Sequence, residues 1–333
     1  MTDMLKELCS ADSFAGIDDA AKVAEKYLSK YAKVSRHGGS VIAVTGRDET
    51  KKTVMLEAHI DQIGMAVTSV ENGFAAVAPI GGIDVRMLPA MRVKIYGKRT
   101  LDGVFCSMPP HLKDSCDSVP DFDSLYIDTG LGKAADELIS VGDRVAFDDG
   151  EFRKLHGSRV TARSLDDRAG CAAVIRVSQL LHGKELPVNV VFLLSDKEEI
   201  GGMGAKTATF SIDPDIAVAV DVSFGDQPGI EKEKTGTLGG GAMLGISPIL
   251  SHKVTAALKR SAENAGVSLQ TEVMGGKTST DADCIALSRS GVACGLLSIP
   301  LRNMHTPVEI VDTDDIEAAA RIMADFVMTG CEL

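Results

Sequence analysis

The chain has 333 residues, of which 44% are hydrophobic and 4% aromatic, and its formal net charge is −12 at pH 7. This length exceeds what one core ordinarily supports, so we expect a large domain and a smaller one. The negative charge leaves no basic surface for nucleic acid or for an anionic membrane, and it argues against both partners. No apolar run reaches the length of a membrane span, and the N-terminus lacks a signal-like apolar region. We therefore expect a cytoplasmic protein.

The first part of the chain predicts helices followed by strands. Residues 4–34 have apolar positions at helical spacing, which predicts one or two helices, and SVIAVTGR (40–47) and TVMLEAH (53–59) are typical of strands. Between about residues 80 and 159, short β-rich pieces alternate with Gly, Pro, Asp and Ser clusters, the pattern of a small β module. We expect a small β-barrel-like domain at 71–160, inserted into a larger domain formed by 1–70 and 161–333.

The second half of the chain alternates helices with strands. A helix is predicted after Asp167 and ends near Gly183, and a last helix runs from about residue 313 to 329. Between them we expect strands at 188–195, 216–223 and 293–300, and a helix at 250–266. This alternation predicts an α/β protein in which a mostly parallel sheet is covered by helices on both faces, as three α/β/α layers.

Ionisable residues stand where these predicted strands end. In open α/β sheets such residues gather at one edge, and here they are His59, Asp61, Glu198, Glu199, Asp221 and His305. Asp166 and Asp167 stand just before a helix. Each alone has a simpler explanation, such as an N-cap for either aspartate or a half-buried histidine for His59.

Taken together, these residues predict a metal site. Carboxylates packed this closely repel one another unless cations bind, and imidazole with carboxylate but without thiolate suits zinc, cobalt or manganese. More ligands are present than one tetrahedral ion needs, which favours two ions with a bridging carboxylate. Because neighbouring strand residues point to opposite faces, Glu198 and Glu199 should have different roles. One would bind metal, and the other would accept a proton from a metal-activated water.

Several segments, in this order, resemble one known family. They are AHIDQIG, GGIDVRMLPAMRVKIYG, PPHLKD, SLDDRAGC, EEIGGMGA, VDVSFGDQPG, GISPILSHKV and SIPLRNMHTPVEIVD. The chain resembles, over nearly its whole length, the cobalt- or zinc-dependent glutamyl aminopeptidases and tetrahedral TET aminopeptidases, some of which were formerly labelled endoglucanases. The resemblance implies a metallopeptidase fold and a small β domain used in oligomer assembly. It also implies short peptide substrates with a free N-terminus.

The resemblance also implies a role for each residue of the site. It assigns two divalent ions per subunit, zinc or cobalt with manganese as a further option. The implied ligands of the first ion are His59, Asp166 and Asp221, and those of the second are Asp166, Glu199 and His305. Glu198 would be the general base, and Asp61 would orient the ring of His59. The resemblance implies a homo-oligomer, and the sequence leaves open whether it is a dimer, an octamer or a dodecamer.

The chain departs from the family at a few positions near these ligands. Gln62 stands where members often have Glu, SDK precedes the glutamate pair, and Gly202 and Met203 replace a more usual Leu-Arg pair. None of these changes removes a ligand, so they bear on side-chain specificity. Asp281 lies in STDAD, which resembles a family segment near the site, and it is either a substrate-binding residue or a helix N-cap.

The predicted reaction is removal of the N-terminal residue from short peptides. Three alternatives remain open from the sequence. A carboxypeptidase or an amide deacylase could use the same ligands, and a glycosidase would use two carboxylates without metal and leave the histidines without a role. A non-catalytic scaffold would have no need of clustered acids. The sequence does not indicate which N-terminal residue is preferred.

Overall fold

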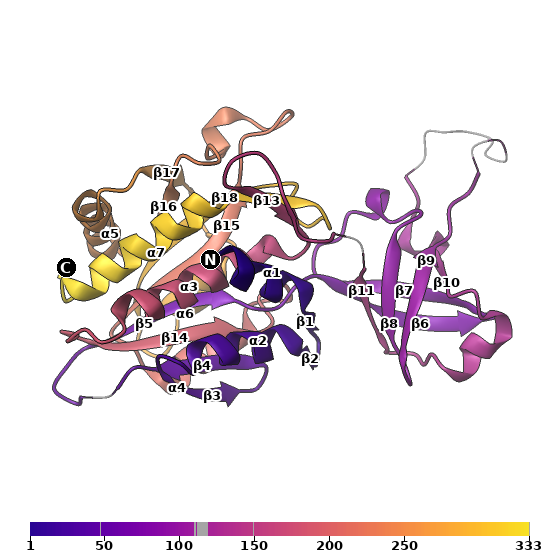
Figure 1. The fold of residues 1–333 in the computed structure, drawn as a ribbon, viewed down its shortest axis with the longest axis horizontal. Helices are drawn as coiled ribbons and strands as arrows, with labels where there is room; N and C mark the ends of the chain where they lie inside the picture. The colour runs from indigo at the N-terminus through magenta and orange to yellow at the C-terminus, as the bar shows by residue number, and fades with distance from the viewer. Residues whose placement is uncertain (47, 110, 112–118, 149, 333) are drawn as a thin grey trace.

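The computed structural model describes residues 1–46, 48–109, 111, 119–148 and 150–332. The chain forms two lobes that lie side by side, a larger one built on a broad sheet and a smaller one that is a β-barrel (Figure 1). The expected strand end at Arg47 and most of the PPHLKD segment lie outside the described residues. Within the described residues, no helix is both long enough and apolar enough to cross a membrane.

The large sheet is parallel in its centre and antiparallel at its sides. Its strands run in the order β12-β13-β19-β18-β15-β5-β14-β4-β3, and β16 and β17 branch from β18. The parallel centre consists of β18 (Ala293–Arg302), β15 (Ile216–Phe224), β5 (Thr53–His59) and β14 (Asn189–Ser195). The other strands are β3 (Lys33–His37), β4 (Ser40–Val44), β12 (Arg153–Lys154), β13 (Arg159–Ala162), β16 (Ala242–Ile246), β17 (Leu269–Val273) and β19 (Glu309–Asp312). Short connections such as that between β3 and β4 permit only antiparallel pairing, so the whole sheet is mixed.

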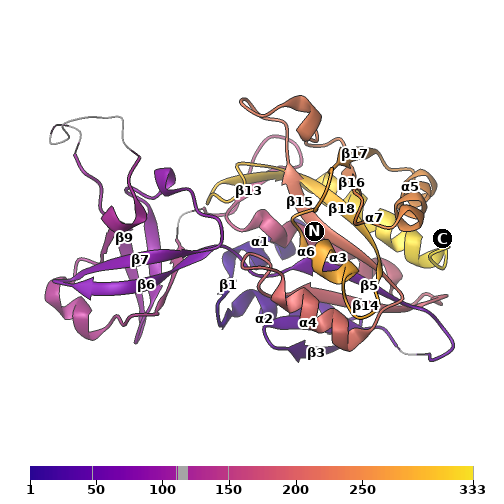
Figure 2. The same cartoon turned by 180° about the vertical axis from the view of Figure 1, so that it is seen from behind.

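Helices cover both faces of this sheet, as expected. Val54 and Leu56 of β5 face the core formed with α1, α2, α3, α5 and α7, whereas Met55 faces the core formed with α4 and α6. Figures 1 and 2 show these two layers from opposite sides. The helices are α1 (Thr2–Ser10), α2 (Asp19–Leu28), α3 (Leu165–Leu181), α4 (Met203–Ile212), α5 (His252–Ala265), α6 (Asp281–Ala286) and α7 (Thr313–Met328). Because alternate residues share a face, His59 leaves β5 on the side of α4 and α6.

The small lobe is a closed antiparallel barrel with the order β10-β7-β6-β11-β8-β9. Its strands are β6 (Gly64–Glu71), β7 (Phe74–Ile80), β8 (Arg92–Tyr96), β9 (Thr100–Phe105), β10 (Tyr126–Asp128) and β11 (Arg144–Phe147). Alternate apolar residues such as Met65, Ile95 and Ile127 fill its interior. The first barrel strand begins at Gly64 and the last ends at Phe147, whereas the expected limits of this domain are 71 and 160. A separate short pair, β1 (Ser13–Phe14) and β2 (Ile17–Asp18), precedes α2.

Candidate active site

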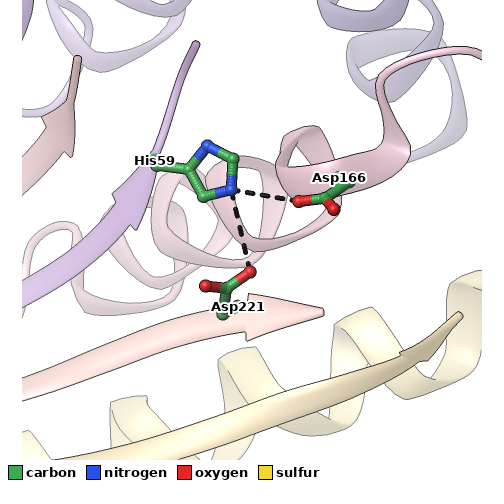
Figure 3. Close-up of side chains that lie close together, drawn as sticks. All are labelled: His59, Asp166 and Asp221. Carbon is green, nitrogen blue, oxygen red and sulfur yellow. Dashed lines mark hydrogen bonds and ion pairs between the residues drawn. The ribbon is translucent and has the colours of Figure 1, made fainter. Parts of the chain in front are cut away.

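The ends of two central strands and the start of α3 bring a first group of ligand-type residues together. His59 is the last residue of β5, Asp221 lies in the neighbouring strand β15, and Asp166 lies in the first turn of α3. Nε2 of His59 is 3.0 Å from Oδ1 of Asp166 and 3.7 Å from Oδ1 of Asp221. Figure 3 shows both carboxylates pointing toward this one ring nitrogen. All three side chains are buried.

A second group shares Asp166 with the first. Nε2 of His305 is 3.3 Å from Oδ2 of Asp166 and 3.6 Å from Oε2 of Glu199. Asp166 thus directs one carboxylate oxygen to each histidine. The adjacent Asp167 does not take part, because its Oδ1 accepts a hydrogen bond from the backbone N–H of Gly170. Asp167 thus binds the backbone in the first turn of α3, whereas Asp166 faces the two histidines.

The spacing and chemistry of both groups fit divalent cations. Two ligand atoms about 2.1 Å from one tetrahedral ion lie about 3.4 Å from each other, and the four distances above range from 3.0 to 3.7 Å. Each group offers one imidazole and two carboxylates, whose ligand atoms all lie within 4.8 Å of one another. Nitrogen and oxygen donors without sulfur suit zinc, cobalt or manganese. The residues present therefore fit a site for two metal ions.

Without cations this arrangement places carboxylates in an unfavourable environment. Burial, together with the charge of Asp166, raises the pKa of Glu199 to about 8. Burial also raises the pKa of Asp221 well above its usual value. For Asp166 burial acts in the same direction, but hydrogen bonds from His305 and His59 outweigh it and lower the pKa. Bound cations would remove the repulsion that makes the ionised carboxylates costly here.

Glu198 and Glu199 lie in a turn, so the expectation that they continue a strand is wrong. Strand β14 already ends at Ser195. Asp61 then holds the turn, because Oδ1 accepts from the backbone N–H of Glu198 at 3.0 Å and Oδ2 from that of Glu199 at 3.3 Å. The two side chains have different neighbours because of this turn rather than because of strand alternation.

Asp61 contacts His59 more weakly than it contacts the turn. Its Oδ1 is 3.5 Å from Nδ1 of His59, which is too long for an ordinary hydrogen bond. Nδ1 of His59 therefore has no hydrogen-bond partner among the described residues. The stronger contacts of Asp61 are those that fix the backbone of the glutamate pair.

Glu309 also positions the site, although it is not among the residues predicted from the sequence. Its two carboxylate oxygens accept from the backbone N–H of His305 at 2.9 Å and from that of Asp166 at 3.1 Å. His305 has a left-handed backbone with a φ of 60°, a conformation that such a hydrogen bond can hold. In the sequence, Glu309 is marked only by its place four residues after His305, at the first residue of β19.

Asp281 and the departures from the family do not line the main cavity at this site, and Gln62 lines only a small second cavity beside Asp166, Glu199 and His305. Asp281 begins α6, where its Oδ2 accepts from Oγ of Ser195 at 2.5 Å, and the N-cap is the preceding Thr280. Gln62 is buried and bonds to Asp12, Arg168 and the backbone of Ser13. The wall of the main cavity includes none of these residues, nor Lys197, Gly202 or Met203.

Gly202 instead meets a packing requirement. Its φ is 68°, and a Cβ added there would lie 2.6 Å from Sγ of Cys284 and 2.9 Å from Oδ1 of Asp281. Both the backbone conformation and the lack of space exclude a larger residue.

The cavity has a volume of about 540 Å³ and extends beyond the two ligand groups. Its wall contains His59, Asp166, Glu198, Glu199, Asp221 and His305. The wall also contains Ser223, Ser298 and Glu272, from β15, β18 and β17, and the apolar side chains of Phe224, Met274, Leu296 and Met304. This shape offers room for a side chain next to the ligand groups.

Comparison with known proteins shows the family to which the chain is similar. Residues 39–322 match the model of the M42 glutamyl aminopeptidase family. The chain is 32% identical to the lysyl aminopeptidase of Pyrococcus furiosus over 92% of this chain and 89% of that protein. It is 26% identical to the glutamyl aminopeptidase of Lactococcus lactis subsp. cremoris, over 93% and 90% of the two chains.

Solved structures show the same fold. An aminopeptidase from the archaeon Desulfurococcus kamchatkensis superimposes with a TM-score of 0.91 at 32% identity, covering 98% of this chain and 94% of that one. The TET1 peptidase of Pyrococcus horikoshii superimposes with a TM-score of 0.87 at 27% identity, covering 98% of both chains. That peptidase is described as assembling into a tetrahedron or a large octahedral shell.

Proposed function

Because the chain belongs to the M42 glutamyl aminopeptidase family and is a peptide hydrolase, we propose that it removes the N-terminal residue from short peptides at a site for two divalent cations. Zinc or cobalt, with manganese as a further option, suits the donors. One observation carries the proposal of two ions. The carboxylate of Asp166 directs one oxygen to each of two histidines, and each histidine has a further carboxylate beside it.

In this proposal, His59, Asp166 and Asp221 hold one cation, and Asp166, Glu199 and His305 hold the other. When bound, such cations lower the pKa of water and polarise a peptide carbonyl. The clustered carboxylates also give the cavity a negative potential that attracts the free α-ammonium of a peptide.

Glu198 is the proposed general base. Its carboxylate lines the cavity, and burial, opposed by the nearby His59, raises its pKa to about 7. A base with a pKa near neutrality can take the proton of an attacking water and return it to the leaving amine. The hydrogen bond from the backbone of Glu198 to Asp61 keeps the turn that presents this carboxylate in place.

The proposal includes self-assembly. The TET relatives form closed assemblies, and we propose that this chain forms a homo-oligomer through its barrel lobe. A cytoplasmic location, expected from the sequence, is part of the same proposal.

A comparison of blocked and free substrates tests this function. We expect hydrolysis of a free tripeptide, no hydrolysis of the same tripeptide with an acetylated N-terminus, and loss of hydrolysis after chelation. Only an aminopeptidase needs the free amine. Equal rates on both peptides would instead indicate a carboxypeptidase, hydrolysis of the acetylated peptide alone would indicate a deacylase, and activity that survives chelation would contradict the metal site.

A further inference from the structure

The cavity beyond the ligand groups contains one acidic side chain that the proposed chemistry does not use. Glu272 lies on β17, which is separated from β15 by β16 and β18. Its side chain is half-buried in the cavity wall. Its Oε2 accepts from Oγ of Ser298 at 2.7 Å, and its Oε1 accepts from Oγ of Ser223. Ser298 pairs in register with Asp221, so Glu272 is one side chain removed from the ligand groups.

These contacts orient the carboxylate of Glu272 but bring no positive charge to it. Both partners are neutral hydroxyls, and no lysine, arginine or histidine of the described residues forms an ion pair with Glu272. A half-buried carboxylate held in this way can accept further hydrogen bonds from a cation. Its position in the cavity means that this cation can come from a substrate.

Apolar side chains also line the cavity. They are Phe224, Met274, Leu296 and Met304. Long basic side chains combine an apolar stem with a charged end, and they favour surfaces that offer both. Apolar walls with one oriented carboxylate therefore match lysine or arginine better than leucine or glutamate.

We propose that Glu272 makes the enzyme prefer peptides with an N-terminal lysine or arginine. The methylene stem packs against the apolar wall, and the ammonium or guanidinium donates to the Glu272 carboxylate. This inference rests on the proposed function, since it concerns the side chain of the residue to be removed.

Lys277 offers the competing preference, for an acidic N-terminal residue, because it lines the same cavity. Its side chain is exposed, and no hydrogen bond or ion pair orients it within the described part of the chain. Holding a solvated lysine in one position costs side-chain entropy, whereas Glu272 is already fixed. The geometry thus favours the basic substrate.

Aminoacyl-anilides of lysine, arginine, leucine and glutamate provide the first test. We expect the highest kcat/KM for lysyl and arginyl substrates. Glu272→Gln should lower the lysyl-to-leucyl ratio of kcat/KM by about tenfold or more, the loss typical of one charge-assisted hydrogen bond. Glu185→Gln makes the same charge change at an exposed position outside the cavity, and it should leave that ratio unchanged. An unchanged ratio in Glu272→Gln overturns the inference, as does a glutamyl preference that Lys277→Gln removes.

A binding measurement separates failure of this inference from failure of the proposed function. Calorimetric titration with free L-lysine and L-leucine needs no turnover. If none of the anilides is cleaved with any cation, the proposed function fails. Tighter binding of lysine than of leucine, lost in Glu272→Gln, still supports the inference in that case. Equal binding of lysine by the two proteins overturns it.

Discussion

Glu198 and Glu199 are neighbours with different surroundings. Glu199 lies 3.6 Å from Nε2 of His305, whereas Glu198 forms no ion pair within the described part of the chain and lines the cavity. This difference supports a ligand role for Glu199 and a base role for Glu198. A base that is not a ligand can be changed without losing the cations.

Replacing Glu198 by Gln tests this division. The amide cannot accept the proton, so we expect kcat to fall by about 100-fold to 10,000-fold, with bound metal unchanged. Glu199→Gln is the matched control and should lose metal as well as activity. Steady-state kinetics with metal analysis of both variants make the comparison, and full activity in Glu198→Gln would show that another group is the base.

Single residues could be predicted from the sequence when they stand at a recognisable boundary. His59 follows an apolar strand and Asp166 precedes a helix, and parallel strands bring such positions to one edge. Glu272 stands at no such boundary, and the local signal for Glu309 is only its place four residues after His305. Glu309 bonds to Asp166 across 143 residues of sequence, and Glu272 reaches its serines only because β17 joins the sheet through β16.

At the scale of elements, α4 supports the turn that carries the glutamate pair. A Cβ added to Gly204, in the first turn of α4, would lie 1.9 Å from the backbone oxygen of Asp196. The helix therefore begins in direct contact with the backbone at the start of the turn.

Gly204→Ala should destabilise the protein by about 3 kcal/mol, because backbone atoms must move to admit the methyl group. Urea denaturation measures this change in the free energy of unfolding. Gly275→Ala is the control, since its added Cβ would meet no atom within 4 Å and its φ is not positive. Equal stability of the two variants would mean that the start of α4 is not tightly packed.

Long helices and strands could be predicted from the periodicity of apolar residues, whereas shorter ones could not. The strand expected at 188–195 is β14, and the helix expected from about 313 to 329 is α7. Strand β16 and helix α6 were not predicted, because five or six residues carry too little periodicity. The glutamate pair was treated as neighbouring strand residues, although the apolar run that predicts the strand ends at Ser195 and carries no information on the turn that follows.

At the scale of the whole molecule, the outer face of the barrel has a patch in which three exposed apolar side chains, Phe74, Val104 and Tyr126, surround Asp128. Asp128 pairs in register with Phe74 on one side and Val104 on the other, and Tyr126 shares its face. The three side chains are 42%, 44% and 43% exposed. An apolar patch on an outer face is typical of a contact between protein chains.

If this patch joins subunits, Val104→Lys should reduce the assembly to smaller species, because it replaces a short apolar side chain at the contact by a long charged one that must lose its hydration. Light scattering coupled to gel filtration measures the mass. Thr100→Lys adds the same charge on the outer face of β9 outside the patch and should leave the mass unchanged. A wild-type mass in Val104→Lys would exclude this patch from the interface.

The two-lobe organisation could be inferred from sequence, since short β-rich pieces interrupt an alternating α/β pattern. The β-barrel-like form of the inserted domain was also expected, but the order of its strands was not, because pairings such as β9–β10, which closes the barrel, are long-range contacts. The antiparallel flanks of the large sheet were also not predicted, because strand direction depends on connections rather than on composition.

The number of divalent ions bound per chain tests the central claim most directly. Mass spectrometry of metals in protein loaded with zinc or cobalt and then freed of excess ions gives this number. We expect two ions per chain in the wild type and in Glu198→Gln, and fewer in His305→Ala, because His305 belongs to one of the two groups that share Asp166. One ion or none in the wild type would contradict the two-metal site.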